Sequence, residues 1–194
     1  MIPHISSLRQ LVQGIHPMEE PELEAFLSVW HEVKFKRKEI VTSAGELEKY
    51  LYFVCEGVQR VYYLNDEGKE ATLVFTYPPS FGGVFDAFLQ QTPSRYYYET
   101  LTASVFLRAS FADVRNLMHA HHAVETFMRK GITAAASGLM ERITELQCFS
   151  AEERFRILLK RSPHILQLVP HKYLANYLGM DATNFSKLLN KIRI

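Results

Sequence analysis

The sequence has few cysteines, no long apolar segment and almost no net charge, and each scarcity argues against a class of protein. Its two cysteines, Cys55 and Cys148, form no CxxC pair, which argues against a zinc site, an iron–sulfur cluster and a disulfide framework. No apolar run approaches the roughly 18 residues of a membrane-spanning helix, and the first residues lack the pattern of a signal peptide. We therefore expect a cytoplasmic protein that does not enter a membrane.

Sequence signatures of common enzymes are also missing. The chain contains no GxSxG, GxxxxGK[ST] or HExxH motif. The carboxylates at 66, 67 and 70 surround an expected hairpin turn, where no pocket would enclose them for acid–base chemistry. His119, His121 and His122 could offer metal ligands, but without a nearby cysteine or acidic ligand solvated histidines account for them better. Haem bound through a histidine or Cys55 has still less support, so we expect no enzyme and no cofactor.

Charge is unevenly distributed although the total is only +1. From Ser150 onward eight basic residues stand against three acidic ones, which gives this end a net charge of +5 and leaves −4 for the rest. A basic terminal module on an acidic remainder indicates contact with a polyanion at one end of the molecule.

Apolar periodicity divides the chain into a helical start, a β-rich middle and a helical end. Residues 4–31 show helical spacing interrupted by prolines, whereas the segment from His31 to Ala109 alternates as strands do and contains turn signals such as Asn65–Gly68. Several short strands with Gly-containing turns predict a barrel or roll. The strands are expected at 31–41, 50–55, 58–64, 70–77, 96–103 and 105–109, and the later helices at 113–119, 124–149 and 152–161.

The helix expected at 124–149 has a long apolar stripe. A helix of this kind, leaving a β-domain, favours pairing with its own copy in a parallel homodimer. Packing against its own domain is the alternative.

Residues 169–192 have the pattern of a helix-turn-helix. Leu174, Ala175 and Leu178 form one apolar face, and the small Ala175 allows a second helix to cross closely. Gly179 stands where the turn needs a left-handed residue, and Asp181 suits the N-cap of the next helix. The buried stripe of that helix is expected to comprise Phe185, Leu188, Leu189 and Ile192.

The opposite face of the last helix carries short polar and cationic side chains, which suit contacts in the major groove of double-stranded DNA. A generic helical hairpin that caps the core is the alternative. We expect base contacts from Thr183, Asn184 and Lys187, and phosphate contacts from Ser186, Asn190 and Lys191.

Nearly the whole chain resembles the Crp/Fnr-type transcription regulators. The resemblance is carried by Lys36–Val41, Gly45, Leu51–Val54, Glu56–Tyr62, a cassette-like Phe81-Gly82-Gly83 followed by Pro93-Ser94-Arg95, and the helix-turn-helix from Leu174 to Lys187. It implies an α+β protein with an N-terminal double-stranded β-roll of the cyclic-nucleotide-binding type, a dimerisation helix and a DNA-binding helix-turn-helix. The expected boundaries are 1–122 for the sensor domain with its N-terminal helices, 123–149 for the dimerisation helix, and 150–194 for the helix-turn-helix domain.

The cassette departs from the pattern of members that bind cyclic AMP. The resemblance places a glutamate for the ribose hydroxyl where this chain has Gly83, and small residues after the arginine where this chain has tyrosines. The missing carboxylate would cost a buried hydroxyl about 1–3 kcal/mol, and the tyrosines could fill the pocket. The candidate effector residues are Phe81, Gly82, Gly83, Arg95 and Tyr96.

Two hypotheses remain open. In the first, the chain is a transcription regulator whose roll responds to an unidentified small molecule or to none, and the departures in the cassette disfavour cyclic AMP. In the second, it is a dimeric small-molecule-binding module whose helix-turn-helix does not bind specific DNA. Charge reversal at Lys187 and Lys191 distinguishes them, because only the first predicts weaker and less salt-dependent DNA binding.

Overall fold

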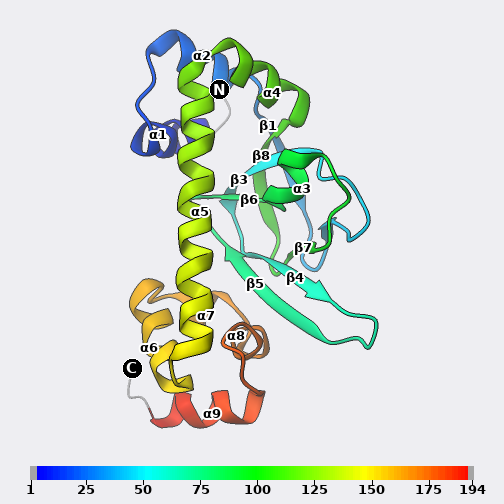
Figure 1. Ribbon diagram of the computed structural model, residues 1–194, viewed down its shortest axis with the longest axis vertical. Helices are drawn as coiled ribbons and strands as arrows, with labels where there is room; N and C mark the ends of the chain where they lie inside the picture. The colour runs from blue at the N-terminus through cyan, green and yellow to red at the C-terminus, as the bar shows by residue number, and fades with distance from the viewer. Residues whose placement is uncertain (1–3, 192–194) are drawn as a thin grey trace.

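The computed structural model describes residues 4–191 and consists of a β-roll flanked by one long helix, with further helices at both ends (Figure 1). The elements are α1 (Ile5–Ile15), α2 (Glu20–Ser28), β1 (His31–Phe35), β2 (Ile40–Thr42), β3 (Tyr50–Glu56), β4 (Gln59–Leu64), β5 (Glu70–Thr76), β6 (Ser80–Gly82), α3 (Phe85–Gln90), β7 (Tyr97–Thr100), β8 (Ser104–Ser110), α4 (Phe111–Ala120), α5 (His122–Cys148), α6 (Ala151–Arg161), α7 (Ile165–Leu168), α8 (His171–Tyr177) and α9 (Ala182–Lys191).

The predicted roll consists of two antiparallel four-stranded sheets with the strand orders β1-β8-β3-β6 and β2-β7-β4-β5. β5 therefore forms an edge of the second sheet. The turn predicted at Asn65–Gly68 is present, and Gly68 adopts a positive φ of 80° there while its N–H donates to the Asn65 carbonyl. The strand expected at 96–103 is shorter, since β7 starts at Tyr97 and ends at Thr100.

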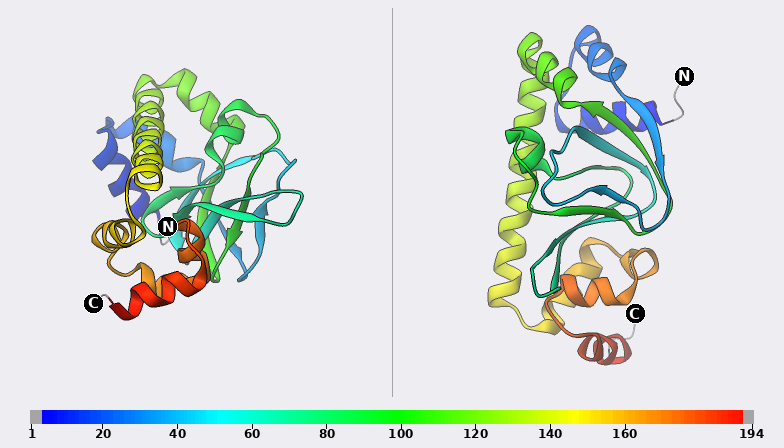
Figure 2. Two further views of the ribbon diagram at one scale, coloured as in Figure 1. Left: turned by 60° about the horizontal axis from the view of Figure 1, so that its bottom comes forward. Right: turned by 90° about the vertical axis from the view of Figure 1, so that its right-hand side faces the viewer.

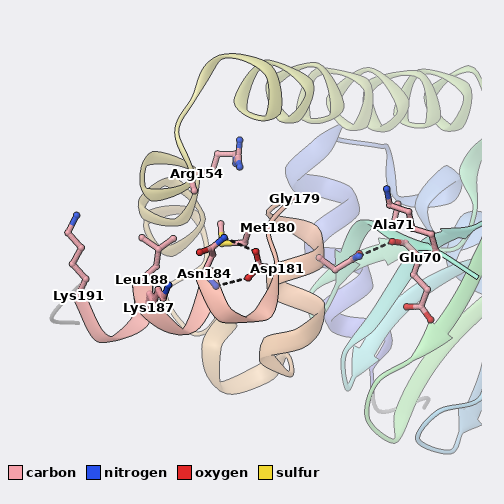
Figure 3. A pocket seen from close by; sticks show the side chains of 13 residues that line it. Glu70, Ala71, Arg154, Gly179, Met180, Asp181, Asn184, Lys187, Leu188 and Lys191 are labelled. Atoms are coloured by element: carbon pink, nitrogen blue, oxygen red, sulfur yellow. Dashed lines mark hydrogen bonds between the residues drawn. The ribbon is translucent and has the colours of Figure 1, made fainter.

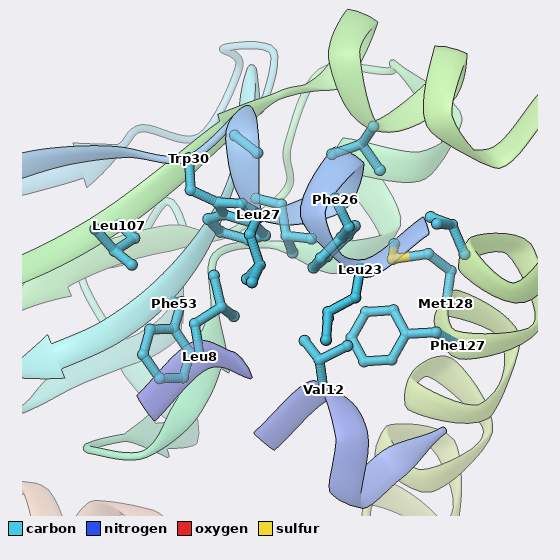
Figure 4. Close-up of a cluster of buried hydrophobic side chains, with 14 of the residues drawn as sticks. Leu8, Val12, Leu23, Phe26, Leu27, Trp30, Phe53, Leu107, Phe127 and Met128 are labelled. Carbon is cyan, nitrogen blue, oxygen red and sulfur yellow. The ribbon is translucent and has the colours of Figure 1, made fainter. Parts of the chain in front are cut away.

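A hydrophobic cluster joins the N-terminal helices to the roll and to α5. Leu8 and Val12 of α1, Phe26 of α2 and Phe127 of α5 are all buried and point toward one another (Figure 4). The rings of Phe26 and Phe127 meet edge to face at 5.3 Å. Each fully buried phenylalanine contributes roughly 1.5–3 kcal/mol, so this cluster attaches the start of α5 firmly to the sensor half.

Helix α5 extends along the roll and brings the C-terminal helices to the far end of the molecule (Figures 1 and 2). Helix α6 follows α5 directly, and Ser150 caps its N-terminus. The Ser150 hydroxyl accepts from the Glu153 N–H, and the Glu153 carboxylate accepts from the Ser150 N–H. This capping box lets the chain reverse direction within a few residues. Helix α8 therefore lies beside the last turns of α5, and α9 lies beyond its C-terminal end (Figure 1).

Local sequence signals predicted the helix-turn-helix correctly. Gly179 has a positive φ of 67°, and Asp181 caps α9 because its Oδ1 accepts from the Asn184 N–H at 2.7 Å. Phe185 is buried and Leu188 and Leu189 are partly buried, whereas Ile192 lies outside the described residues. Helices α3 and α7 and strand β6 were not predicted, because six residues or fewer are too short to show a period.

Candidate nucleic-acid interface and sensor pocket

Helix α9 presents an exposed polar face at the end of the molecule. Its amphipathic sequence places Phe185 in the core, against Phe155 of α6 at 5.5 Å, so the remaining faces point outward. All of the residues predicted to contact DNA lie on this one helix, and all are exposed: Thr183, Asn184, Ser186, Lys187, Asn190 and Lys191.

These side chains differ in how free they are. Thr183, Lys187 and Asn190 follow the i, i+4, i+7 spacing of a single helix face, opposite the buried stripe. Asn184 donates to the Asp181 carboxylate at 2.7 Å, and Lys191 is paired with Glu152 of α6 at 2.6 Å. Among residues 4–191, Lys187 makes no salt bridge, so it is the cation that α9 can offer a ligand without breaking a contact.

A wide hollow borders one flank of α9. Its volume is about 830 Å³, and Asn184, Lys187, Leu188 and Lys191 line it together with Arg154 of α6 (Figure 3). The start of β5 closes the far side. Arg154, Lys187 and Lys191 place positive charge around this hollow, which suits a chain of phosphates passing along α9.

The exposed side of α5 carries an apolar seam that the described residues leave uncovered. Ile132, Ala136, Leu139, Ile143 and Leu146 recur at alternating spacings of four and three, as in a parallel coiled coil. Four of these five are large hydrophobic side chains that are 38–48% exposed.

An ionic cluster lies where the roll meets α8. The Arg60 guanidinium is almost fully buried and binds Glu99 at 2.8 Å and Glu70 at 2.6 Å. Burial works against the charge of Arg60, but the hydrogen bonds that Arg60 donates to the two carboxylates, together with their negative charge, outweigh burial and raise the pKa of Arg60. The Tyr173 ring of α8 lies 4.0 Å from the same guanidinium. No local pattern in the sequence indicated this contact, since its residues come from four separate elements.

The predicted effector residues do not line one common pocket, and neighbouring side chains pack against several of them. Phe81 packs against Phe53, Trp30 and Phe127, on the side of β6 that faces α5. A side chain at Gly82 would overlap the hydroxyl of Tyr98, a residue with no exposed surface. That hydroxyl lies 3.0 Å from Thr76 Oγ1, and burial raises the pKa of Tyr98 well above its ordinary value.

Glu48 occupies the space next to Gly83. A Cβ at Gly83 would lie 3.3 Å from the Tyr52 ring and 3.4 Å from Glu48 Oε2. The buried Glu48 carboxylate accepts from the Thr42 hydroxyl at 2.6 Å and from the Val84 N–H at 3.3 Å. Burial raises its pKa, and these hydrogen bonds offset the effect only in part. The sequence signalled the vacancy at Gly83 but not the loop residue that fills it.

Arg95 and Tyr96 lie at the outer end of the cassette. Arg95 is exposed, and within residues 4–191 it forms no ion pair, as expected for a solvated arginine before a strand. Tyr96 is half-buried and packs edge to face on Tyr63 at 6.5 Å. The three residues Phe81, Arg95 and Tyr96 therefore face different surroundings.

Within residues 4–191 no group of three or more His, Cys, Asp or Glu side chains is arranged to hold a metal ion. In the same range, no helix combines the length and the hydrophobicity needed to cross a bilayer.

Comparison with known proteins identifies a domain family and a curated relative. Residues 32–121 match the family model of the cyclic nucleotide-binding domain. The chain is 26% identical over 127 residues to the cAMP-activated global transcriptional regulator CRP of Haemophilus influenzae, covering 66% of this chain. The match spans 57% of that relative's own length.

Solved structures show the same fold over most of the chain. FixK2 from Bradyrhizobium japonicum superimposes with a TM-score of 0.77 at 17% identity, over 84% of either chain. A transcriptional regulator of the Crp/Fnr family from Eubacterium rectale gives 0.70 at 17% identity, over 90% of this chain and 83% of the other.

Proposed function

We propose that this protein is a dimeric, sequence-specific DNA-binding regulator of transcription. Two findings support the proposal: residues 32–121 match the family model of the cyclic nucleotide-binding domain, and most of the chain shares its fold with FixK2 and with a Crp/Fnr-family regulator. The observation that carries the proposal is the free polar face of α9, with Thr183, Lys187 and Asn190 pointing away from the core. Acting on chromosomal DNA places the protein in the cytoplasm.

The second element of the proposal is a homodimer built on the apolar seam of α5. Two parallel copies of α5 bury the seam and bring both α9 helices to the same end of the dimer, since each lies beyond the C-terminal end of its α5 (Figure 1). Such a pair contacts two half-sites related by a two-fold axis, about one helical turn of DNA apart.

The third element is that cyclic AMP is not the effector. Gly83 has no side chain to bind a ribose hydroxyl, and the Glu48 carboxylate beside it already accepts from Thr42 and Val84. Arg95 is the charged member of the five candidate effector residues, and it lies at the surface.

Selection of duplexes from a random DNA pool tests this function. We expect the purified protein to enrich a palindrome, with the same result when cyclic AMP is added. If a palindrome is enriched only with a small-molecule extract of the cell, DNA binding requires an effector other than cyclic AMP. If a folded dimer enriches no sequence in any condition, the chain is a binding module without specific DNA contacts.

Charge reversal on α9 separates specific binding from fortuitous attraction. Lys187→Glu should weaken binding to the selected duplex at least about tenfold, which is the typical value of one good base contact. Lys191→Glu, at a phosphate-contacting position, should lower the slope of affinity against salt by about one. Lys34→Glu, an exposed lysine on β1, is the matched control and should leave the affinity unchanged.

A further inference from the structure

The outer edge of β5 is occupied by a side chain from the helix-turn-helix. As an edge strand, β5 presents backbone groups that no neighbouring strand can use. At this edge the Thr72 N–H donates to Asn176 Oδ1 at 2.6 Å, and Asn176 Nδ2 donates to the Glu70 carbonyl at 2.8 Å. The carboxamide of Asn176 thus replaces a missing strand over three residues of β5.

A carboxamide can make both bonds, because its oxygen accepts and its nitrogen donates. A carboxylate accepts but does not donate, and the hydroxyl of serine or threonine is too short to reach two backbone groups. Asn176 also begins the turn into α9, since its backbone carbonyl accepts from the Gly179 N–H at 3.0 Å. Asn176 therefore both binds the edge of β5 and starts the turn that sets the direction of α9.

Contacts on either side leave α8 little freedom. One turn earlier, Tyr173 packs on the buried Arg60 and hydrogen-bonds Lys38 of the roll. On the opposite side, the guanidinium of Arg142 in α5 lies 4.0 Å from the Tyr177 ring and donates to the Tyr177 carbonyl. Helix α8 is clamped between the β5 edge and α5, and Asn176 supplies the directional bonds of that clamp.

We propose that Asn176 is a positioning residue that fixes the direction of α9 relative to the roll, and thereby the half-site spacing that the dimer accepts. This inference rests on the proposed function. In a rigid dimer the two α9 helices have one separation, so one spacing binds best. If α8 is loosened, each α9 keeps its contacts to its half-site, but the dimer tolerates several spacings.

The test compares affinities for one half-site and for palindromes whose spacer is varied one base pair at a time, using the half-site from the selection. Wild type should prefer one spacing by at least about tenfold, since two directional hydrogen bonds of ordinary net strength oppose the reorientation. Asn176→Ala and Asn176→Asp should retain half-site affinity while the preference falls below about threefold.

Asn65→Asp is the matched control. It adds the same charge, in the β4–β5 hairpin that Asn176 contacts from α8. Asn65 uses its oxygen, which accepts from the Lys69 N–H at 2.7 Å. This variant should keep the wild-type spacing preference. An unchanged preference in both Asn176 variants would overturn the inference, as would an equal loss of half-site and palindrome binding, because Asn176 would then contact DNA or support the fold of α9.

Hydrogen exchange at the Thr72 amide tests the clamp without DNA, so its result stands even if no DNA sequence is enriched. Asn176→Ala should accelerate exchange of that amide about tenfold, while the amides of the central strand β3 keep their protection. Unaltered protection of the Thr72 amide would show that the bond does not hold α8 to β5.

Discussion

Glu48 places a carboxyl group inside the roll where the cassette has a glycine. It is 2% exposed, and its neighbours are uncharged donors and the Tyr52 ring rather than a cation. Such a carboxyl is more stable protonated, which is why burial raises its pKa. The folded state therefore binds a proton that the unfolded chain releases at the ordinary value.

This proton makes the stability depend on pH. The contribution of Glu48 is fully present below the ordinary pKa of 4.5 and is lost as the pH rises through the raised value. Glu48→Gln mimics the protonated form, so its free energy of unfolding relative to wild type should increase across that window and then stay level. Urea unfolding from about pH 4 to about pH 8 measures the difference.

Glu46→Gln, on the exposed part of the same loop, is the control. Its free energy of unfolding should change with pH as that of the wild type does. A Glu48→Gln variant whose advantage shrinks with rising pH would mean that the carboxylate is held by a charge partner in the fold.

At single residues, sequence reasoning succeeded where the cause is local. Gly179 and Asp181 were predicted because a left-handed turn and an N-cap each select a residue type at one position. The roles of Glu48 and Asn176 could not be predicted, since the Val84 N–H beside the cassette is 36 residues from Glu48 and the β5 groups are 104 and 106 residues from Asn176. Only the fold brings those partners together.

Among the elements, α5 has the most extensive apolar surface that the described residues leave exposed to water. A continuous apolar seam in water is costly, and burying one isoleucine or leucine contributes roughly 1.5–3 kcal/mol. The 4-3 spacing of the seam directs it to a second parallel helix rather than to the roll. The dimer of the proposed function depends on this seam.

Ile143→Asp places a charge in the middle of the seam, with 48% of the side chain exposed in the single chain. Burying an unpaired carboxylate between two helices costs several kcal/mol, so the variant should sediment as a monomer at micromolar concentrations where wild type is a dimer. Ala134→Asp lies on the opposite face of α5 and should remain dimeric. If both variants stay dimeric with wild-type circular dichroism, the dimer uses another surface.

The elements predicted from sequence are those long enough to show a period, including α5 and most strands. The short α3 and α7 have no such signal, because tertiary packing rather than propensity holds helices of this length. Ile165 of α7, for example, is buried in the cluster that joins α8 to the roll.

At the scale of the whole molecule, the sensor and helix-turn-helix halves share one hydrophobic cluster. Val58 and Leu101 of the roll are buried together with Leu174 of α8, with Leu178 directly after α8, and with Phe155 of α6. The boundaries at residues 122 and 149 were predicted as part of the family resemblance. The sequence could not indicate the contact between the halves, because a packed interface between two amphipathic units leaves no mark on either pattern.

A shared cluster should make the two halves unfold together. Leu174→Ala removes a side chain with no exposed surface and should destabilise the protein by about 2–5 kcal/mol. Trp30 is the only tryptophan and lies in the opposite cluster, beside Phe26 and Phe81. We expect its fluorescence transition in urea to move to lower concentration, coincident with the loss of helical circular dichroism.

The protein concentration must be held constant in this comparison, since a dimer's stability depends on it. Leu168→Ala, at a 38% exposed position of α7, is the control and should shift the midpoint little. If Leu174→Ala melted the helical signal early while the Trp30 transition stayed in place, the helix-turn-helix would be an independent unit. The hydrogen bonds of Asn176 would then be the main link between the halves rather than one part of a common core.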